Sequence, residues 1–135
     1  LLRQVGGPNS DYTFSPADAA PLNQHQFQWV EGGIVLFDNR VEQAGSRVIE
    51  LRLDDAVGTA TEVATLTHEP DVYVYALGDV HREAEGSTLV AWSSAGMLTD
   101  YSPDGEVRWE MQTELGNAMG FMERVDALPG VRRVR

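Results

Sequence analysis

The sequence predicts an all-β protein built from short antiparallel strands. Glycine and proline clusters punctuate its 135 residues and leave runs of about five to ten residues between them, which are too short for helices of ordinary length. These runs are rich in β-branched and aromatic residues, and several alternate apolar with polar side chains, as half-buried strands do. A weak internal repeat also groups the strands in fours.

The first group of strands is predicted at residues 25–30, 33–38, 46–53 and 60–66. Residues 34–37, Ile-Val-Leu-Phe, form a continuous apolar run, which is typical of a strand covered on both faces by neighbouring sheets. Residues 48–53 alternate instead, as expected for a strand with one buried face. The Asp38-Asn39 pair is expected to cap the following turn through hydrogen bonds from its side chains to nearby backbone.

The second group of strands lies within residues 77–113. It contains the apolar run at 89–92 and an alternating run at 106–111, which follows Ser-Pro-Asp-Gly at 102–105. That tetrapeptide predicts a type I turn with glycine in the left-handed conformation, and therefore a hairpin.

The repeat relates these two groups. Residues 25–38 align with residues 79–92 at a constant offset of about 54, and Gly32 falls on Gly86. Four antiparallel strands per period of this order are typical of a β-propeller blade. The alternative, a β-sandwich of about eight strands, explains the spacing of the turns but not the repeat.

The chain is expected to form part of a propeller. Residues 25–66 and 77–113 are each predicted to form a blade, residues 1–5 the outer strand of a preceding blade, and residues 119–128 a strand that closes the ring or opens the next blade. Two to three blades cannot close a ring, because rings have at least about four. The expected partners are therefore missing propeller blades or further copies of the chain.

Charge and composition exclude several classes of function. The chain has 21 acidic residues against ten basic ones, all of them arginine, and a formal charge of −11. This acidic balance argues against a nucleic-acid partner, and the lack of a long apolar run argues against membrane insertion. Without cysteine or lysine there is no thiol nucleophile, cysteine-ligated zinc or phosphate-binding Gly-Lys loop. No spacing typical of zinc or calcium ligands occurs, so neither a metal nor another cofactor is predicted.

An ordered set of motifs resembles the carboxy-terminal third of arylsulfotransferase-like propellers. The set consists of residues 2–7, residues 10–14, Gln24-His25, Gly33 to Asn39, Ser46 to Glu50, Gly78 to Arg82, Gly86 to Val90, Pro103 to Val107 and Trp109-Glu110. The resemblance implies a six-bladed propeller, in the periplasm or outside the cell, that transfers a sulfuryl group from an aryl sulfate to a phenol through a sulfohistidine. The alternative within the same fold is a non-catalytic propeller that acts as a binding or scaffold module.

His25 is the candidate nucleophile, because it matches the nucleophile of that family and because a neutral imidazole is nucleophilic near pH 7. The repeat places Asp79 at the equivalent position of the second group, so both residues are expected at the start of innermost strands that line a central channel. The candidate substrate-binding residues are Asp79, Arg47, His81 and Arg124. Most other histidine and arginine groups of the family lie upstream, so the isolated segment is expected to be inactive. The remaining histidine, His68, is expected on the surface.

Overall fold

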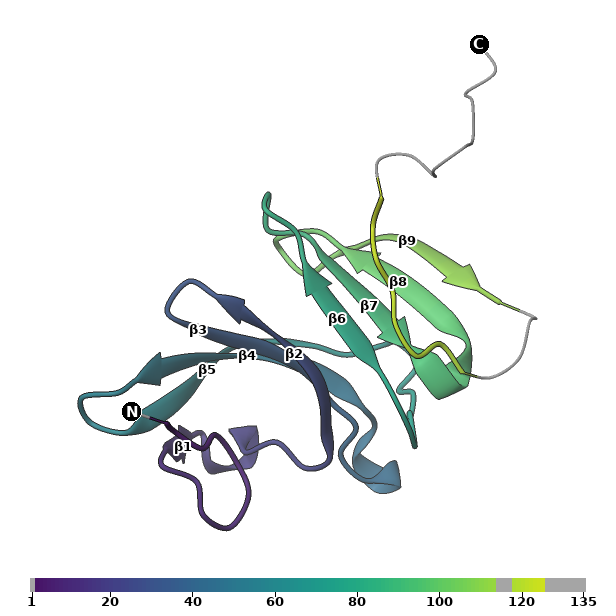
Figure 1. Ribbon diagram of the computed structural model, residues 1–135. Helices are drawn as coiled ribbons and strands as arrows, with labels where there is room; N and C mark the ends of the chain where they lie inside the picture. Colours follow the sequence, from purple (N-terminus) through teal and green to yellow (C-terminus); the bar gives the residue numbers. More distant parts are fainter. Residues whose placement is uncertain (1, 114–117, 126–135) are drawn as a thin grey trace.

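The computed structural model describes residues 2–113 and 118–125 of the chain, which form an all-β structure of two sheets packed against each other (Figure 1). Within this part of the chain there is no α-helix, only three single-turn 3₁₀ segments, η1 (Ala17–Ala19), η2 (Glu42–Ala44) and η3 (Ser93–Ala95). Neither sheet closes into a barrel or a propeller. The prediction of an all-β fold is therefore confirmed.

The first sheet is an up-and-down meander of β2 (Gln24–Val30), β3 (Gly33–Asp38), β4 (Arg47–Asp54) and β5 (Thr59–Leu66). Each strand lies within one or two residues of its predicted bounds. A fifth, short strand, β1 (Thr13–Ser15), pairs in parallel with β5 and completes the order β1-β5-β4-β3-β2. Gly33 must be glycine, because a Cβ there would lie 1.9 Å from the carbonyl oxygen of Leu51 on the neighbouring strand.

The second sheet has the order β6 (Asp79–Arg82), β7 (Thr88–Trp92), β8 (Met97–Tyr101) and β9 (Val107–Gln112). The predicted hairpin at 102–105 joins β8 to β9. In it the Gly105 amide donates to the Ser102 carbonyl at 2.9 Å, and Gly105 has a φ of +82°. The prediction of this turn is confirmed.

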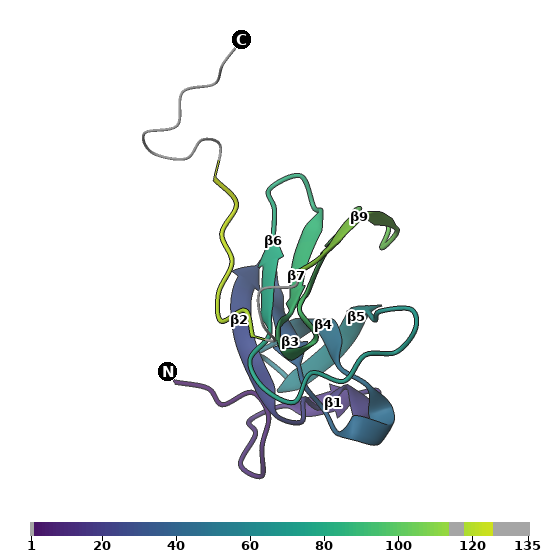
Figure 2. The same ribbon diagram turned by 90° about the vertical axis from the view of Figure 1, so that its right-hand side faces the viewer.

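The two sheets meet face to face, and their first strands lie side by side: both views place β2 beside β6 (Figures 1 and 2). We call the face of the first sheet that meets the second sheet its front face, and the opposite face its back face. The core between the sheets is an apolar cluster made of Val35, Phe37, Val48, Val74, Val80, Val90, Trp92, Met97 and Tyr101. Val74 comes from the linker between the sheets, residues 67–78, which is thus part of this core.

The back face of the first sheet is covered by the N-terminal segment and not by another sheet. Val5, Phe14 and Ala19 pack there on a second cluster, formed by Ile34, Leu36, Ile49 and Leu51. All six residues of β3 are consequently buried, as the apolar run predicted. Among the described residues no second sheet packs on the back face, so the expected cover by a sheet on this side stays a prediction.

The predicted strand at residues 1–5 is absent from its described part, residues 2–5. The Gln4 amide donates to the Asp11 carboxylate at 2.6 Å, and the Gln4 carbonyl accepts from the Asp11 amide at 2.8 Å. These bonds close a loop through Gly6 and Gly7, which both have positive φ, so the backbone amide and carbonyl of Gln4 are already used and cannot pair in a strand. β1 is the N-terminal segment that joins the sheet.

The predicted strand at residues 119–128 is also not seen in the residues described there, 119–125, while residues 126–128 lie outside the described part. Residues 118–125 are held on the second sheet by two hydrogen bonds. The Ser93 hydroxyl donates to the Met119 carbonyl, and the Met122 amide donates to the Asp79 carboxylate at 2.9 Å. The segment therefore lies alongside β6 without pairing as a strand.

Candidate functional site

His25 lies near the start of β2, where its ring meets the end of the linker. Its Nδ1 atom is 2.8 Å from the carbonyl oxygen of Gly78. A carbonyl can only accept, so Nδ1 carries a proton and donates it. In the neutral ring Nε2 then holds a free lone pair, and it has no hydrogen-bond partner among the described residues. This is the protonation pattern that a nucleophilic imidazole needs.

A β-bulge directs the His25 side chain to the front face. His25 pairs with Phe37, whereas Phe27 pairs with Leu36, because Gln26 is the extra residue of the bulge and has a φ of +22°. Residues paired across antiparallel strands share a face, so His25 lies on the face of Phe37, and Phe27 on that of Leu36. Without the bulge, His25 and Phe27 would share one face.

Asp79 holds the position in the second sheet that His25 holds in the first. It pairs with Ala91, and both members of this pair lie 54 residues after the pair of His25 and Phe37. The Asp79 side chain is engaged in structure, since it accepts from the amides of Val80 and Met122, each at 2.9 Å. No hydrogen bond or ion pair joins it to His25 within the described residues.

Arg47 is held in a buried ionic cluster on the first sheet. Its Nε lies 3.2 Å from Asp38 Oδ2, one terminal nitrogen lies 3.6 Å from Glu62, and the other donates to the Asp18 carbonyl at 2.8 Å. Burial raises the pKa of the Asp38 carboxyl above its ordinary value, while the amide of Leu22 and the Arg47 guanidinium act in the opposite direction. Because Arg47 is 6% exposed and fully engaged, it is poorly placed to bind a substrate.

His81 and Arg124 come together around Glu83, at the end of β6. His81 Nε2 is 4.0 Å from the Glu83 carboxylate, and Arg124 is 3.5 Å from Glu83 and 3.9 Å from Glu85. Arg82, the last residue of β6, pairs with Glu50 at 2.7 Å. The structure thus brings these two candidate residues together, but at carboxylates and without a described contact to His25.

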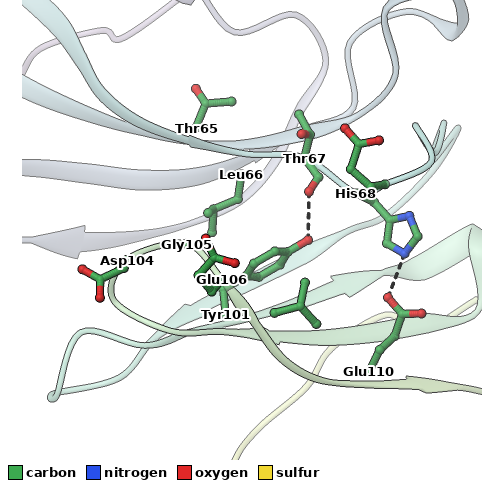
Figure 3. A pocket seen from close by; sticks show the side chains of 11 residues that line it. Thr65, Leu66, Thr67, His68, Tyr101, Asp104, Gly105, Glu106 and Glu110 are labelled. Carbon is green, nitrogen blue, oxygen red and sulfur yellow. Dashed lines mark hydrogen bonds and ion pairs between the residues drawn. The ribbon is translucent and has the colours of Figure 1, made fainter.

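His68 is buried, so its expected place on the surface is wrong. Figure 3 shows its ring between the two sheets, with Nε2 2.7 Å from Glu110 on β9, while Nδ1 is 2.8 Å from the Pro70 carbonyl. The ring also meets Trp92 edge to face, with 5.8 Å between centroids. No local pattern could have revealed this cluster, because Glu110 lies 42 residues away in the chain.

The pocket around His68 has an acidic wall. Glu69, Asp104, Glu106 and Glu110 line it together with the Tyr101 ring, whose hydroxyl donates to the Thr67 carbonyl at 3.0 Å (Figure 3). The part of the chain that the structure describes contains no group of three or more side chains placed to hold a metal ion. The pocket therefore offers hydrogen-bond acceptors at the rim between the sheets, and little to attract an anion.

The stability of the protein at alkaline pH should depend on Tyr101. Burial, with Glu110 nearby, raises the pKa of Tyr101 to about 12, from an ordinary value of about 10. The folded state then holds the phenol proton more tightly than the unfolded state, so this contribution to the free energy of unfolding is complete below about pH 10 and is lost as the pH rises toward about 12. Urea unfolding followed by circular dichroism should show a flatter loss of stability in this range for Tyr101→Phe than for the wild type. The exposed Tyr75 is the control, and an equal flattening in Tyr75→Phe would contradict the assignment.

A second open area lies beside β2 on the back face of the first sheet. Phe27 and Trp29 form its wall, with their rings edge to face and 6.0 Å between centroids, and Ile34 and Leu36 form its floor. Both aromatic side chains are more than half exposed. This area is an unpaired apolar surface, and His25 also lines it, while its ring nitrogen Nδ1 meets the Gly78 carbonyl.

Comparison with known proteins adds no relative: no protein-family model, no curated protein and no solved structure matches this chain. Among the described residues no helix is long and apolar enough to cross a membrane.

Proposed function

We propose that the chain contributes two neighbouring blades of a β-propeller and that His25 is the nucleophile of a sulfuryl-transfer site between them. The observation that carries the proposal is the hydrogen bond from His25 Nδ1 to the Gly78 carbonyl, which leaves Nε2 unprotonated in the neutral ring. Sulfuryl transfer is the chemistry implied by the resemblance of Gln24-His25 and the surrounding motifs to the arylsulfotransferase-like family.

The orientation of the two sheets supports the propeller. Val35 on the front face of the first sheet corresponds, 54 residues on, to Leu89, which points away from the first sheet. Leu36 on the back face corresponds to Val90, which packs against the front face of the first sheet. Equivalent side chains therefore point the same way around the stack, as they do from blade to blade in a propeller.

The segment 118–125 supports a further blade after the second. On the first sheet, Asn39 bonds the carbonyls of Val74 and Leu77, and His25 bonds that of Gly78. On the second sheet, Ser93 and Asp79, each 54 residues later, bond Met119 and Met122. Residues 119–122 thus sit on the second sheet as residues 74–78 sit on the first, so residue 123 would correspond to the start of a third innermost strand.

The proposed reaction has two displacements at sulfur. The His25 Nε2 lone pair attacks the sulfur of an aryl sulfate, an N–S bond forms, and the S–O bond to the departing phenolate breaks. The oxygen of an acceptor phenol, whose proton passes to a base, then attacks the same sulfur, and the N–S bond breaks. Both steps need donors to the three sulfuryl oxygens. Arg47, Arg82 and Arg124 are all paired with carboxylates, so other donors are needed. We therefore expect the described part of the chain to be inactive by itself.

The second candidate function is a non-catalytic propeller that binds a partner or serves as a scaffold. The observation that favours it is the same pairing of Arg47, Arg82 and Arg124, together with a formal charge of −11 that repels a sulfate ester at long range. The two candidates differ in whether a covalent intermediate forms.

The test uses the natural polypeptide that carries these residues, incubated with a chromogenic aryl sulfate with and without an acceptor phenol. We expect steady release of the coloured phenol only with acceptor, and peptide mass spectrometry should find one added SO₃ group on His25. His25→Asn should abolish both signals and leave the melting temperature nearly unchanged, because an asparagine amide can still donate to the Gly78 carbonyl.

Tyr75→Phe, at an exposed residue outside the candidate site, is the control and should keep the sulfated peptide. Transferase activity in the His25→Asn protein would remove the nucleophile assignment. If the wild type gives neither phenol release nor a sulfated peptide, the proposed sulfuryl transfer is wrong and the scaffold function is favoured.

A further inference from the structure

We propose that Asn39 is a positioning residue for His25: it holds the end of the linker so that the Gly78 carbonyl meets His25 Nδ1, which fixes the ring tautomer with Nε2 free. The catalytic consequence rests on the proposed function. The tautomer is a property of the chain that can be measured without any substrate.

The Asn39 side chain bonds a distant segment and not the local turn, whereas Asp38, the other residue of the predicted cap, does accept from the Arg40 amide at 3.3 Å. Asn39 is 6% exposed at the end of β3, and its Nδ2 donates to two linker carbonyls, those of Val74 and Leu77, at 2.7 Å each. Both amide hydrogens are thus used on a stretch 35 to 38 residues away. Asn39 is therefore the group that fixes the last turn of the linker on the first sheet.

The backbone that Asn39 holds is an unfavourable one. Leu77 has a φ of +64°, a left-handed conformation that costs energy for a residue with a branched side chain, and Gly78 has a φ of +120°. The linker adopts this path because the Leu77 carbonyl is bonded to Asn39. Once that bond is lost, no other described residue binds the Leu77 carbonyl, and the Leu77-Gly78 peptide can move to a more favourable backbone conformation.

Gly78 is needed for the close approach that this path creates. A Cβ on Gly78 would lie 2.3 Å from Cδ1 of Phe37, so no other residue fits without moving that ring. Phe37 is the residue that pairs with His25 across β2 and β3. The contact of the Gly78 backbone with Phe37 therefore brings its carbonyl beside the His25 ring.

A separate clamp, Ser46, holds the linker further upstream. Its hydroxyl accepts from the Val74 amide at 2.8 Å and donates to the Asn39 carbonyl at 3.0 Å, and its amide donates to the Val72 carbonyl at 2.8 Å. The Ser46 clamp keeps residues 72–74 in place when the Asn39 side chain is changed. Loss of the Asn39 amide should thus act on residues 77 and 78, next to His25.

The experiment is long-range ¹⁵N–¹H NMR of the histidine rings, at a pH where His25 is neutral, in the wild type and in Asn39→Ala and Asn39→Asp. In the wild type, His25 should be the Nδ1–H tautomer almost completely. In both variants the Nδ1–H fraction should fall to about half or less, because a ring without a fixed acceptor can place its proton on either nitrogen. Asn23→Asp is the matched control, since Asn23 also bonds a carbonyl, that of Arg40, but not the linker, and it should leave the His25 tautomer unchanged.

Two results would overturn the proposal: a wild-type His25 that carries its proton on Nε2, which requires no variant to observe, or folded Asn39 variants in which His25 stays fully Nδ1–H. If the tautomer changes as expected but the wild type forms no sulfated peptide, then the positioning is correct and the proposed sulfuryl transfer is wrong. The wild-type spectrum decides the first point even if a variant does not fold.

Discussion

Replacing Trp92 with alanine is expected to lower the free energy of unfolding by about 3–5 kcal/mol. Trp92 is fully buried at the centre of the core between the sheets, edge to face with Phe37 at 5.5 Å. Its Nε1 donates to the Thr99 hydroxyl at 3.1 Å, and Thr99 in turn donates to Glu110. The substitution therefore creates a large cavity and removes one member of a buried hydrogen-bond chain.

Urea unfolding followed by far-UV circular dichroism measures this loss. Trp29→Ala is the matched control, because Trp29 is 69% exposed on the back face, and it should change the free energy of unfolding much less. A loss in Trp92→Ala as small as that expected for Trp29→Ala would show that the contact between the sheets contributes little to stability.

Removing Arg47 is expected to destabilise the fold by about 3–5 kcal/mol, because Arg47→Met leaves the Asp38 carboxylate buried without its cationic partner. The pair is 3.2 Å apart, and Asp38 is fully buried. The double variant Asp38→Asn with Arg47→Met removes both charges and should recover much of the loss. Arg124→Met, at an exposed ion pair, should cost less than about 1 kcal/mol.

The effect of Arg47→Met should also depend on pH. Burial already raises the pKa of Asp38, and loss of the guanidinium raises it further. A folded pKa above the unfolded value favours the folded state at low pH, and this advantage is lost as the pH rises through the folded pKa. The deficit relative to the wild type, measured by thermal and urea unfolding, should be smallest near pH 4 and grow toward pH 7. A deficit that does not change with pH would mean that Asp38 is not the residue left unpaired.

The strands and the main hairpin could be predicted from sequence because their causes are local. The continuous apolar run of β3 and the alternation in β4 follow directly from which faces are buried, and Gly105 can adopt the left-handed backbone that its turn requires. The offset of 54 residues also relates strand pairs in the structure, since His25 pairs with Phe37 and, 54 residues later, Asp79 pairs with Ala91. His25 itself was identified from a motif and from this repeat.

The site was harder to predict, because side-chain partners come from distant segments. Arg47 was a candidate anion-binding residue, yet it lies in a buried cluster with Asp38, a contact that no periodicity encodes. His68 was expected on the surface, yet it is buried, and its partner Glu110 lies 42 residues away on β9 of the second sheet. Residues 1–5 were expected to form a strand, but in the described part of this segment Asp11 bonds the backbone of Gln4 and closes a loop.

The sequence by itself determined the all-β class, the order and bounds of the four strands of the first sheet, and the position of His25 at the start of one of them, because side-chain periodicity and turn chemistry act over a few residues. Only the tertiary structure decided which nitrogen of the neutral His25 ring carries the proton. That depends on a bulge at Gln26, on the Gly78 carbonyl 53 residues away, and on the Asn39 amide that holds the linker. Such contacts form when the two sheets pack, and packing joins residues whose separation along the chain leaves no local signal.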